Sequence, residues 1–277
     1  VHNPLHGKQD LVGYFKTKAE KTGLDEKDPF VTEKPWMDRP DPGLWRERVI
    51  QSNAEYAAMV YSMDENVGRV LSALRQNGLY DDTVVIFMAD NGGLSTFEGS
   101  PTSHLPLRAG KGWLYEGGIR EPMIIRWPGA GKRGVCHEPV TSTDFYPTIL
   151  EMTGQPLRPE QHADGVSLAP LLKGEASLER KALYWHYPHY SNQGDKPGGA
   201  VRYGDYKLIE YYEDMHVELY HLKTDIGETS NLAEAMPDQV ELLRNMLHTW
   251  RKSVDAQMPR PNPDYDPGPD TGKTGQT

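Results

Sequence analysis

Residues 83–93 read TVVIFMADNGG, which combines a strand-like apolar run with a polar, glycine-rich ending. Five apolar residues run without a break up to Met88, and after Ala89 the run ends at Asp90, Asn91 and two glycines. A short apolar run that is rich in β-branched residues predicts a strand buried on both faces. A turn alone would explain the ending, because Asp, Asn and Gly are the usual turn residues. The carboxyl end of a strand is also where open α/β sheets bind their ligands.

The segments around this strand predict the rest of the first domain. In residues 48–77 apolar side chains recur at helical spacing and Gly78 follows, which predicts one long amphipathic helix. A second strand is predicted at residues 123–127 (MIIRW). The remaining expected elements are a short helix within otherwise loop-like residues 1–47, a second helix, and one helical turn, at residues 10–21, 143–154 and 168–173. A helix followed by a buried strand is typical of a doubly wound sheet. We therefore expect an α/β domain over residues 1–180, with a mostly parallel sheet flanked by helices.

The pattern changes after Ala182. Short, Tyr-rich alternating runs predict a small antiparallel sheet, and they read ALYWHY, AVRYGDYKLIEYY and HVELYHL. An amphipathic helix is predicted at residues 237–254. Residues 181–257 should therefore form a small α+β subdomain. The Pro-rich residues 258–277 should form an extended or disordered tail.

Composition excludes several classes of function. The 277-residue chain has a net charge of -10 and no apparent basic patch, which argues against a nucleic-acid partner. No run of 18 apolar residues is present, so we expect no membrane insertion. Cys136 is the one cysteine, which excludes an internal disulfide and a Cys-rich metal site. The sequence does not reveal the oligomeric state.

Two stretches carry candidate chemistry. Asp90 and Asn91 offer the oxygen ligands that a hard cation such as Ca²⁺ or Mg²⁺ requires. Residues 107–122 read LRAGKGWLYEGGIREP, where Lys111 lies between two glycines. Glycines on both sides would let a lysine reach into a crowded anionic site. A turn and a flexible surface loop are the alternatives for these two stretches.

The order of these motifs resembles the sulfatases, the formylglycine-dependent members of the alkaline phosphatase superfamily. The resemblance rests on the buried strand, DNGG, RAGKGWLYEGGIREP, a second apolar strand and WPG, in that order. It extends to YAAMVYSMDENVGRVL, STDFYPTILEMTG and DGVSLAPLLKG, and to YGDYKLIEYYED and VELYHLKTDIGETSNLA near the C-terminus. It implies an alkaline phosphatase-like fold and an arylsulfatase-like sulfuric ester hydrolase.

The resemblance also implies roles for individual residues. Asp90 and Asn91 match the metal ligands of the family, normally to Ca²⁺ in preference to Mg²⁺. Lys111 matches the catalytic lysine that holds the sulfate oxygens and can touch the leaving oxygen. The opening VHNPL resembles the family's His-x-Pro stretch, which makes His2 the second catalytic, sulfate-binding residue. A metal and cations around a tetrahedral dianion would offset charge as it shifts to the leaving oxygen.

Three further histidines are candidates for substrate binding. His104 lies between the metal pair and Lys111 and could line the same cleft. His186 and His189 lie among aromatic residues in YWHYPHY, at the start of the C-terminal subdomain. Aromatic residues with polar tips are common in sugar-binding clefts, although a Tyr-rich strand with hydrogen-bonded histidines is an equal alternative. We expect a sulfated small molecule or glycan as the ligand, preferably a sulfated carbohydrate.

One departure from the family concerns the nucleophile. The family oxidises a Cys or Ser in a C/S-x-P/A-x-R motif to formylglycine, and Cys136 in VCHEPV does not fit this motif. The family's paired aspartates are also absent. Since these features precede the His-x-Pro stretch in the family, we expect a C-terminal portion of a sulfatase, inactive alone, with the formylglycine in an N-terminal half. The resemblance further implies a periplasmic or secreted protein. A phosphate or phosphonate monoesterase, which Asn91 disfavours, and a non-catalytic remnant or binding protein are the alternatives.

Overall fold

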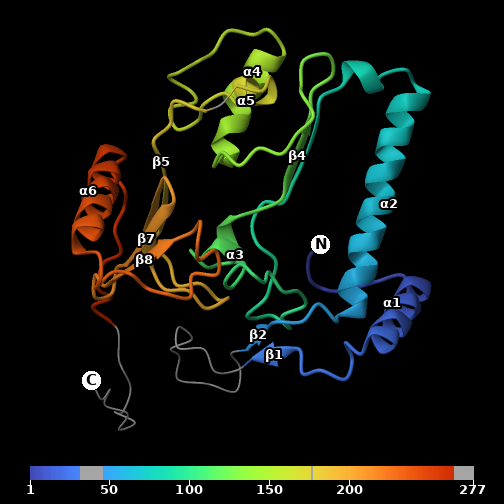
Figure 1. The fold of residues 1–277 in the computed structure, drawn as a ribbon, viewed down its shortest axis with the longest axis horizontal. Coiled ribbons are helices and arrows are strands. Elements are labelled where there is room, and N and C mark those ends of the chain that lie inside the picture. Colours follow the sequence, from blue (N-terminus) through green and yellow to red (C-terminus); the bar gives the residue numbers. More distant parts are fainter. Residues whose placement is uncertain (32–45, 176, 265–277) are drawn as a thin grey trace.

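The computed structural model describes residues 1–31, 46–175 and 177–264 (Figure 1). The first helix, α1 (Gln9–Thr22), confirms the predicted N-terminal helix and ends at Gly23, which has a left-handed φ of 64°. A short antiparallel pair, β1 (Phe30–Val31) with β2 (Glu47–Arg48), was not predicted. The loop prediction for residues 32–45, like the tail prediction for residues 265–277, lies outside the described residues.

The long helix α2 (Ala54–Gln76) stands along one side of the molecule (Figure 1). Its existence was predicted, but its predicted start at residue 48 is wrong by six residues. Asn53 caps the helix, since its side chain accepts a hydrogen bond of 2.9 Å from the backbone N–H of Tyr56. Residues 47 and 48 belong to β2 instead.

The two predicted strands of the first domain lie side by side. β3 (Val85–Met88) and β4 (Met123–Arg126) pair in the antiparallel sense, with Met88 opposite Met123. Both strands are confirmed, whereas a parallel pair is not formed between the described strands of this sheet. β3 is half-buried along its length, because β4 is its sole paired neighbour within the described ranges.

Short helices connect and flank these strands. They are η1 (Tyr80–Asp82), α3 (Glu116–Ile119), η2 (Ser142–Asp144), α4 (Phe145–Met152) and α5 (Ala169–Leu172). The helix predicted at residues 143–154 is confirmed as η2 and α4, and the helical turn at residues 168–173 as α5. Asp144 fixes this part of the chain, since its buried carboxylate accepts hydrogen bonds from the backbone of Thr141 and from the guanidinium of Arg180. The helix α3 was not predicted from the sequence.

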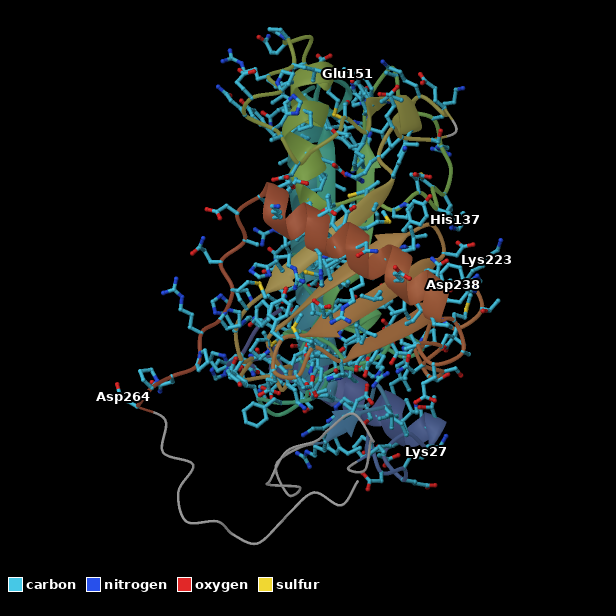
Figure 2. All side chains as sticks on the ribbon, turned by 90° about the vertical axis from the view of Figure 1, so that its left-hand side faces the viewer. Lys27, His137, Glu151, Lys223, Asp238 and Asp264 are labelled. Atoms are coloured by element: carbon cyan, nitrogen blue, oxygen red, sulfur yellow. The ribbon has the colours of Figure 1, made fainter. Side chains whose placement is uncertain are left out.

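The C-terminal part is a four-stranded antiparallel sheet with one helix, as predicted. The strands β5 (Ala182–Tyr187), β6 (Gly198–Tyr203), β7 (Tyr206–Tyr211) and β8 (Val217–His221) pair in sequence order. Figure 2 shows α6 (Pro237–Ser253) lying across one face of these strands. The tail residues 258–264 form no helix or strand.

Side-chain alternation in this sheet determines what lies against each face. Val201, Leu208 and Leu219 stand opposite one another on neighbouring strands and pack with Leu243 and Leu247 of α6. The residues that alternate with them face the other way and form a second core with the loop that follows Lys111; this core contains Ala109, Trp113, Leu114, Tyr115, Ala200, Ile209, Tyr211, Tyr220 and Leu222. The face of the sheet opposite α6 therefore packs against the loop that carries Lys111.

Candidate active site

An open cavity of about 810 Å³ lies at the end of β3. Its lining comes from the N-terminal segment, from α2, from the end of β3 and from the loops before and after α3. Five of the predicted site residues line it: His2, Asp90, Asn91, His104 and Lys111. Segments that are distant in sequence thus meet in one place.

Close backbone contact fixes the end of β3 against α3. The backbone N–H of Gly92 donates a hydrogen bond of 3.1 Å to the carbonyl of Gly118. A Cβ atom on Gly92 would lie 2.0 Å from the carbonyl oxygen of Gly117. Only glycine allows the two glycine pairs, DNGG and EGGI, to approach this closely. The contact holds Asp90 and Asn91 at the rim of the cavity.

The side chains of Lys111 and His2 meet in the cavity. Its Nζ atom lies 3.3 Å from Nε2 of His2, and its backbone N–H donates to the carbonyl of Gly93 at 2.9 Å. The flanking glycines are required by packing, since a Cβ on Gly110 would lie 2.4 Å from the carbonyl oxygen of Gly93. Two nitrogen groups at this spacing can share the oxygens of one tetrahedral anion.

His104 lies in the wall of the cavity and contacts the same carbonyl. Its Nε2 atom lies 3.0 Å from the oxygen of Gly93. Burial lowers the pKa of His104, and the contact with Gly93 opposes this effect only in part. The imidazole is therefore neutral near pH 7.

Glu121 also lines the cavity, although no role was predicted for it from the sequence. Burial, and secondarily the charge of Asp90, raises the pKa of Glu121 to about 7. Its Oε1 atom is buried and has no hydrogen-bond partner among the residues that the structure describes. The one sequence feature that could have drawn attention to Glu121 was its position directly after GGIR and shortly before β4. Nothing in the local sequence indicated that it would approach Asp90.

The residues at the β3 end fit part of a divalent-cation site. Asp90 and Asn91 present oxygen donors, and the unpartnered Oε1 of Glu121 adds a second carboxylate nearby. Within the described ranges no group of three or more His, Cys, Asp or Glu side chains could hold a metal ion. Asp90 and Asn91 are therefore a partial set of ligands.

His186 and His189 do not line this cavity. The ring of His186 contacts the hydroxyl of Tyr212 at 2.7 Å and the carbonyl of Gln257 at 2.9 Å. The ring of His189 meets the ring of Tyr187 edge to face. A role in substrate binding stays a prediction for both histidines.

Among the described helices, none is long and apolar enough to cross a membrane.

Two family profiles match this chain, and they overlap over residues 109–155. The profile of the family described as "Sulfatase" matches residues 1–155, and that described as "N-sulphoglucosamine sulphohydrolase, C-terminal" matches residues 109–255. A "Sulfatase" of Formosa agariphila is 38% identical over 223 residues, 72% of this chain and 40% of that protein. "Arylsulfatase A" of Homo sapiens is 35% identical over 221 residues, 70% of this chain and 42% of that protein. The chain thus spans about two fifths of the length of these relatives.

Solved structures give the same result. The structure of "Ps i-CgsB in complex with k-i-k-neocarrahexaose" superimposes with a TM-score of 0.68 at 27% identity, over 93% of this chain and 49% of that one. A protein "in complex with its substrate D-Glucosamine-2-N, 6-O-disulfate" gives a TM-score of 0.60 at 30% identity, over 73% of this chain and 40% of that one. These similarities confirm the alkaline phosphatase-like fold. With a family match over more than half of its residues and the family's motifs around one cavity, the chain belongs to the sulfatases.

Proposed function

We propose that the complete protein hydrolyses a sulfate ester of a sulfated carbohydrate, and that this chain supplies half of the metal and sulfate-binding site. The observation that carries the proposal is the single cavity that gathers Asp90, Asn91, His2 and Lys111. Neighbours solved with neocarrahexaose and with a glucosamine disulfate support a sulfated glycan as the ligand. Residues from four separate segments of the α/β domain meet around a volume that suits one sugar ring and its sulfate.

The chemistry of the proposed site follows from its charges. Lys111 and His2 hold the sulfate oxygens from one side, and negative charge moves to the ester oxygen as the sulfur–oxygen bond breaks. The ammonium group of Lys111 offsets this charge and needs no reorganisation, because its loop is already fixed. The neutral imidazole of His104 adds a polar wall without a further charge.

The remaining components are those of the family. Membership implies a metal cofactor and a formylglycine in general terms. We propose Ca²⁺ in preference to Mg²⁺ at Asp90 and Asn91, where the bound ion would supply positive charge next to the sulfate. We place the formylglycine nucleophile in the remainder of the complete protein, and the protein itself in the periplasm or outside the cell.

Hydrolysis of an aryl sulfate by the full-length protein with Ca²⁺ tests this proposal. Asp90→Ala should lower kcat/KM by roughly 10²-fold or more, because an incomplete cation site loses charge stabilisation in the transition state. Asp238→Ala is the matched control, since this carboxylate lies on α6, far from β3 (Figures 1 and 2). Undiminished activity in Asp90→Ala would contradict the metal assignment. Faster hydrolysis of the matching aryl phosphate than of the sulfate would instead favour a phosphate monoesterase, and hydrolysis of neither would favour a non-catalytic protein.

A further inference from the structure

The loop between β5 and β6 contacts the chain directly after Lys111. Residues 191–195 of this loop, referred to below as the 191–195 loop, pack against Gly112. A Cβ on Gly112 would lie 2.2 Å from Oγ of Ser191 and 2.8 Å from Oε1 of Gln193. Gly112 also has a φ of 83°, which few other residues adopt. The loop therefore restricts the path of the backbone directly after Lys111.

Gln193 is held firmly in this position. Its backbone carbonyl accepts hydrogen bonds from Oγ1 of Thr96 at 2.8 Å and from Nε1 of Trp113 at 3.0 Å. Its amide donates to Oε1 of Glu98 at 2.7 Å and accepts from Oγ of Ser191 at 3.0 Å. With 8% of its surface exposed and the hydrogen bonds to Glu98 and Ser191 made, the side chain has little freedom to move.

The same loop holds the next residue of the lysine segment. The backbone N–H of Leu114 donates to Oδ2 of Asp195 at 2.8 Å. Residues 112, 113 and 114 thus each contact the 191–195 loop, while the N–H of Lys111 is held from the other side by Gly93. The backbone of Lys111 is fixed on both sides.

We propose that the side chain of Gln193 is a positioning residue for Lys111, through its packing against Gly112. The inference rests on the proposed function for its kinetic test. Gln193 does not line the cavity, so any effect on the reaction must pass through a cavity residue. A displacement of about 1 Å at a catalytic group can lower a rate by about 10²-fold. The C-terminal subdomain therefore sets the place of a catalytic cation in the other domain.

A double-mutant cycle in the full-length protein tests this role. The four proteins are the wild type, Gln193→Ala, Lys111→Ala and the double variant, assayed for kcat/KM on an aryl sulfate and for binding of inorganic sulfate by calorimetry. Gln193→Ala should lower kcat/KM by about 10- to 100-fold and weaken sulfate binding. In the Lys111→Ala background the same change should have no further effect on either quantity. Gln155→Ala, at an exposed position after α4, is the matched control.

Each outcome decides between positioning and general support of the fold. Equal losses from Gln193→Ala in both backgrounds would overturn the proposal, as would a lowered Tm with unchanged kinetics. Gln193→Met keeps the bulk next to Gly112 and should retain more activity than the alanine variant, which guards against a variant that does not fold. If the wild type cleaves no sulfate ester but sulfate binding follows the expected pattern, the proposed function fails and the positioning role is supported.

Discussion

At the residue scale, Asp195 combines deep burial with a structural role. Its two oxygens accept hydrogen bonds of 2.8 Å from the backbone N–H groups of Leu114 and Lys196. Burial raises the pKa of Asp195 from 3.8 to about 7, although both N–H groups act in the opposite direction. The carboxyl that holds the lysine segment therefore changes its charge near neutral pH.

This pKa leads to a prediction about stability and pH. An acid whose pKa is raised by folding contributes stability below its unfolded pKa, and this contribution is lost as the pH rises through the folded pKa. From pH 5 to pH 8, the free energy of unfolding of the wild type should fall by about 1–3 kcal/mol relative to Asp195→Asn. Urea unfolding of the full-length protein at both pH values measures the difference, with Asp238→Asn as control. Parallel pH profiles for the wild type and Asp195→Asn would contradict the raised pKa.

At the element scale, the end of β3 depends on contact with α3. Gly92→Ala would place a methyl group 2.0 Å from the carbonyl oxygen of Gly117. Relieving this overlap requires one of the two backbone segments to move, and Asp90 lies close to Gly92 in the sequence. We predict a loss of about 1–3 kcal/mol in the free energy of unfolding, as for an overpacked core. Gly68→Ala is the control, because Gly68 lies in α2 with nothing within 4 Å of its Cβ position and should gain about 0.5–1 kcal/mol. Denaturant unfolding of both variants makes the comparison, and a neutral Gly92→Ala would show that the two glycine pairs can separate.

Elements were predictable where their signal is local. The apolar run of β3, the helical spacing of α2 and the alternation of β5 to β8 each lie within one segment, so periodicity identified them. The start of α2 was missed because the cap at Asn53 and the strand at residues 47–48 interrupt a pattern that continues past them. The antiparallel pairing of β3 with β4 depends on the path of the chain between them, which periodicity does not encode.

Site residues divide in the same way. The resemblance of their contiguous motifs to the sulfatases predicted site roles for Asp90, Asn91 and Lys111, and the structure places these residues in one cavity with His2. Glu121 and the 191–195 loop were not predicted to have a role, because their proposed roles depend on contacts with residues far away in the sequence. Such contacts become visible only when the fold is known.

At the scale of the whole molecule, the C-terminal sheet packs against a different part of the chain on each of its faces. One face carries α6 and the other carries the loop that presents Lys111. Buried ion pairs strengthen this second contact, with Nζ of Lys207 lying 3.1 Å from Glu116 and 2.8 Å from Glu228. The subdomain thus packs against the loop that carries Lys111, and none of the described subdomain residues lines the cavity.

Binding of Ca²⁺ should be visible in the stability of the complete protein. The nearby charge of Asp90 contributes to the raised pKa of Glu121, so a cation held by Asp90 and Asn91 would relieve the repulsion between the two carboxylates. A ligand that binds the folded state at about 100 times its Kd stabilises that state by about 2.7 kcal/mol. We therefore predict that Ca²⁺ raises the Tm of the full-length protein, that Mg²⁺ raises it less, and that Asp90→Ala abolishes the increase while Asp238→Ala retains it. An equal increase in the Asp90→Ala variant would place the ion elsewhere. Because Tm responds to binding alone, this measurement tests the cation site independently of turnover.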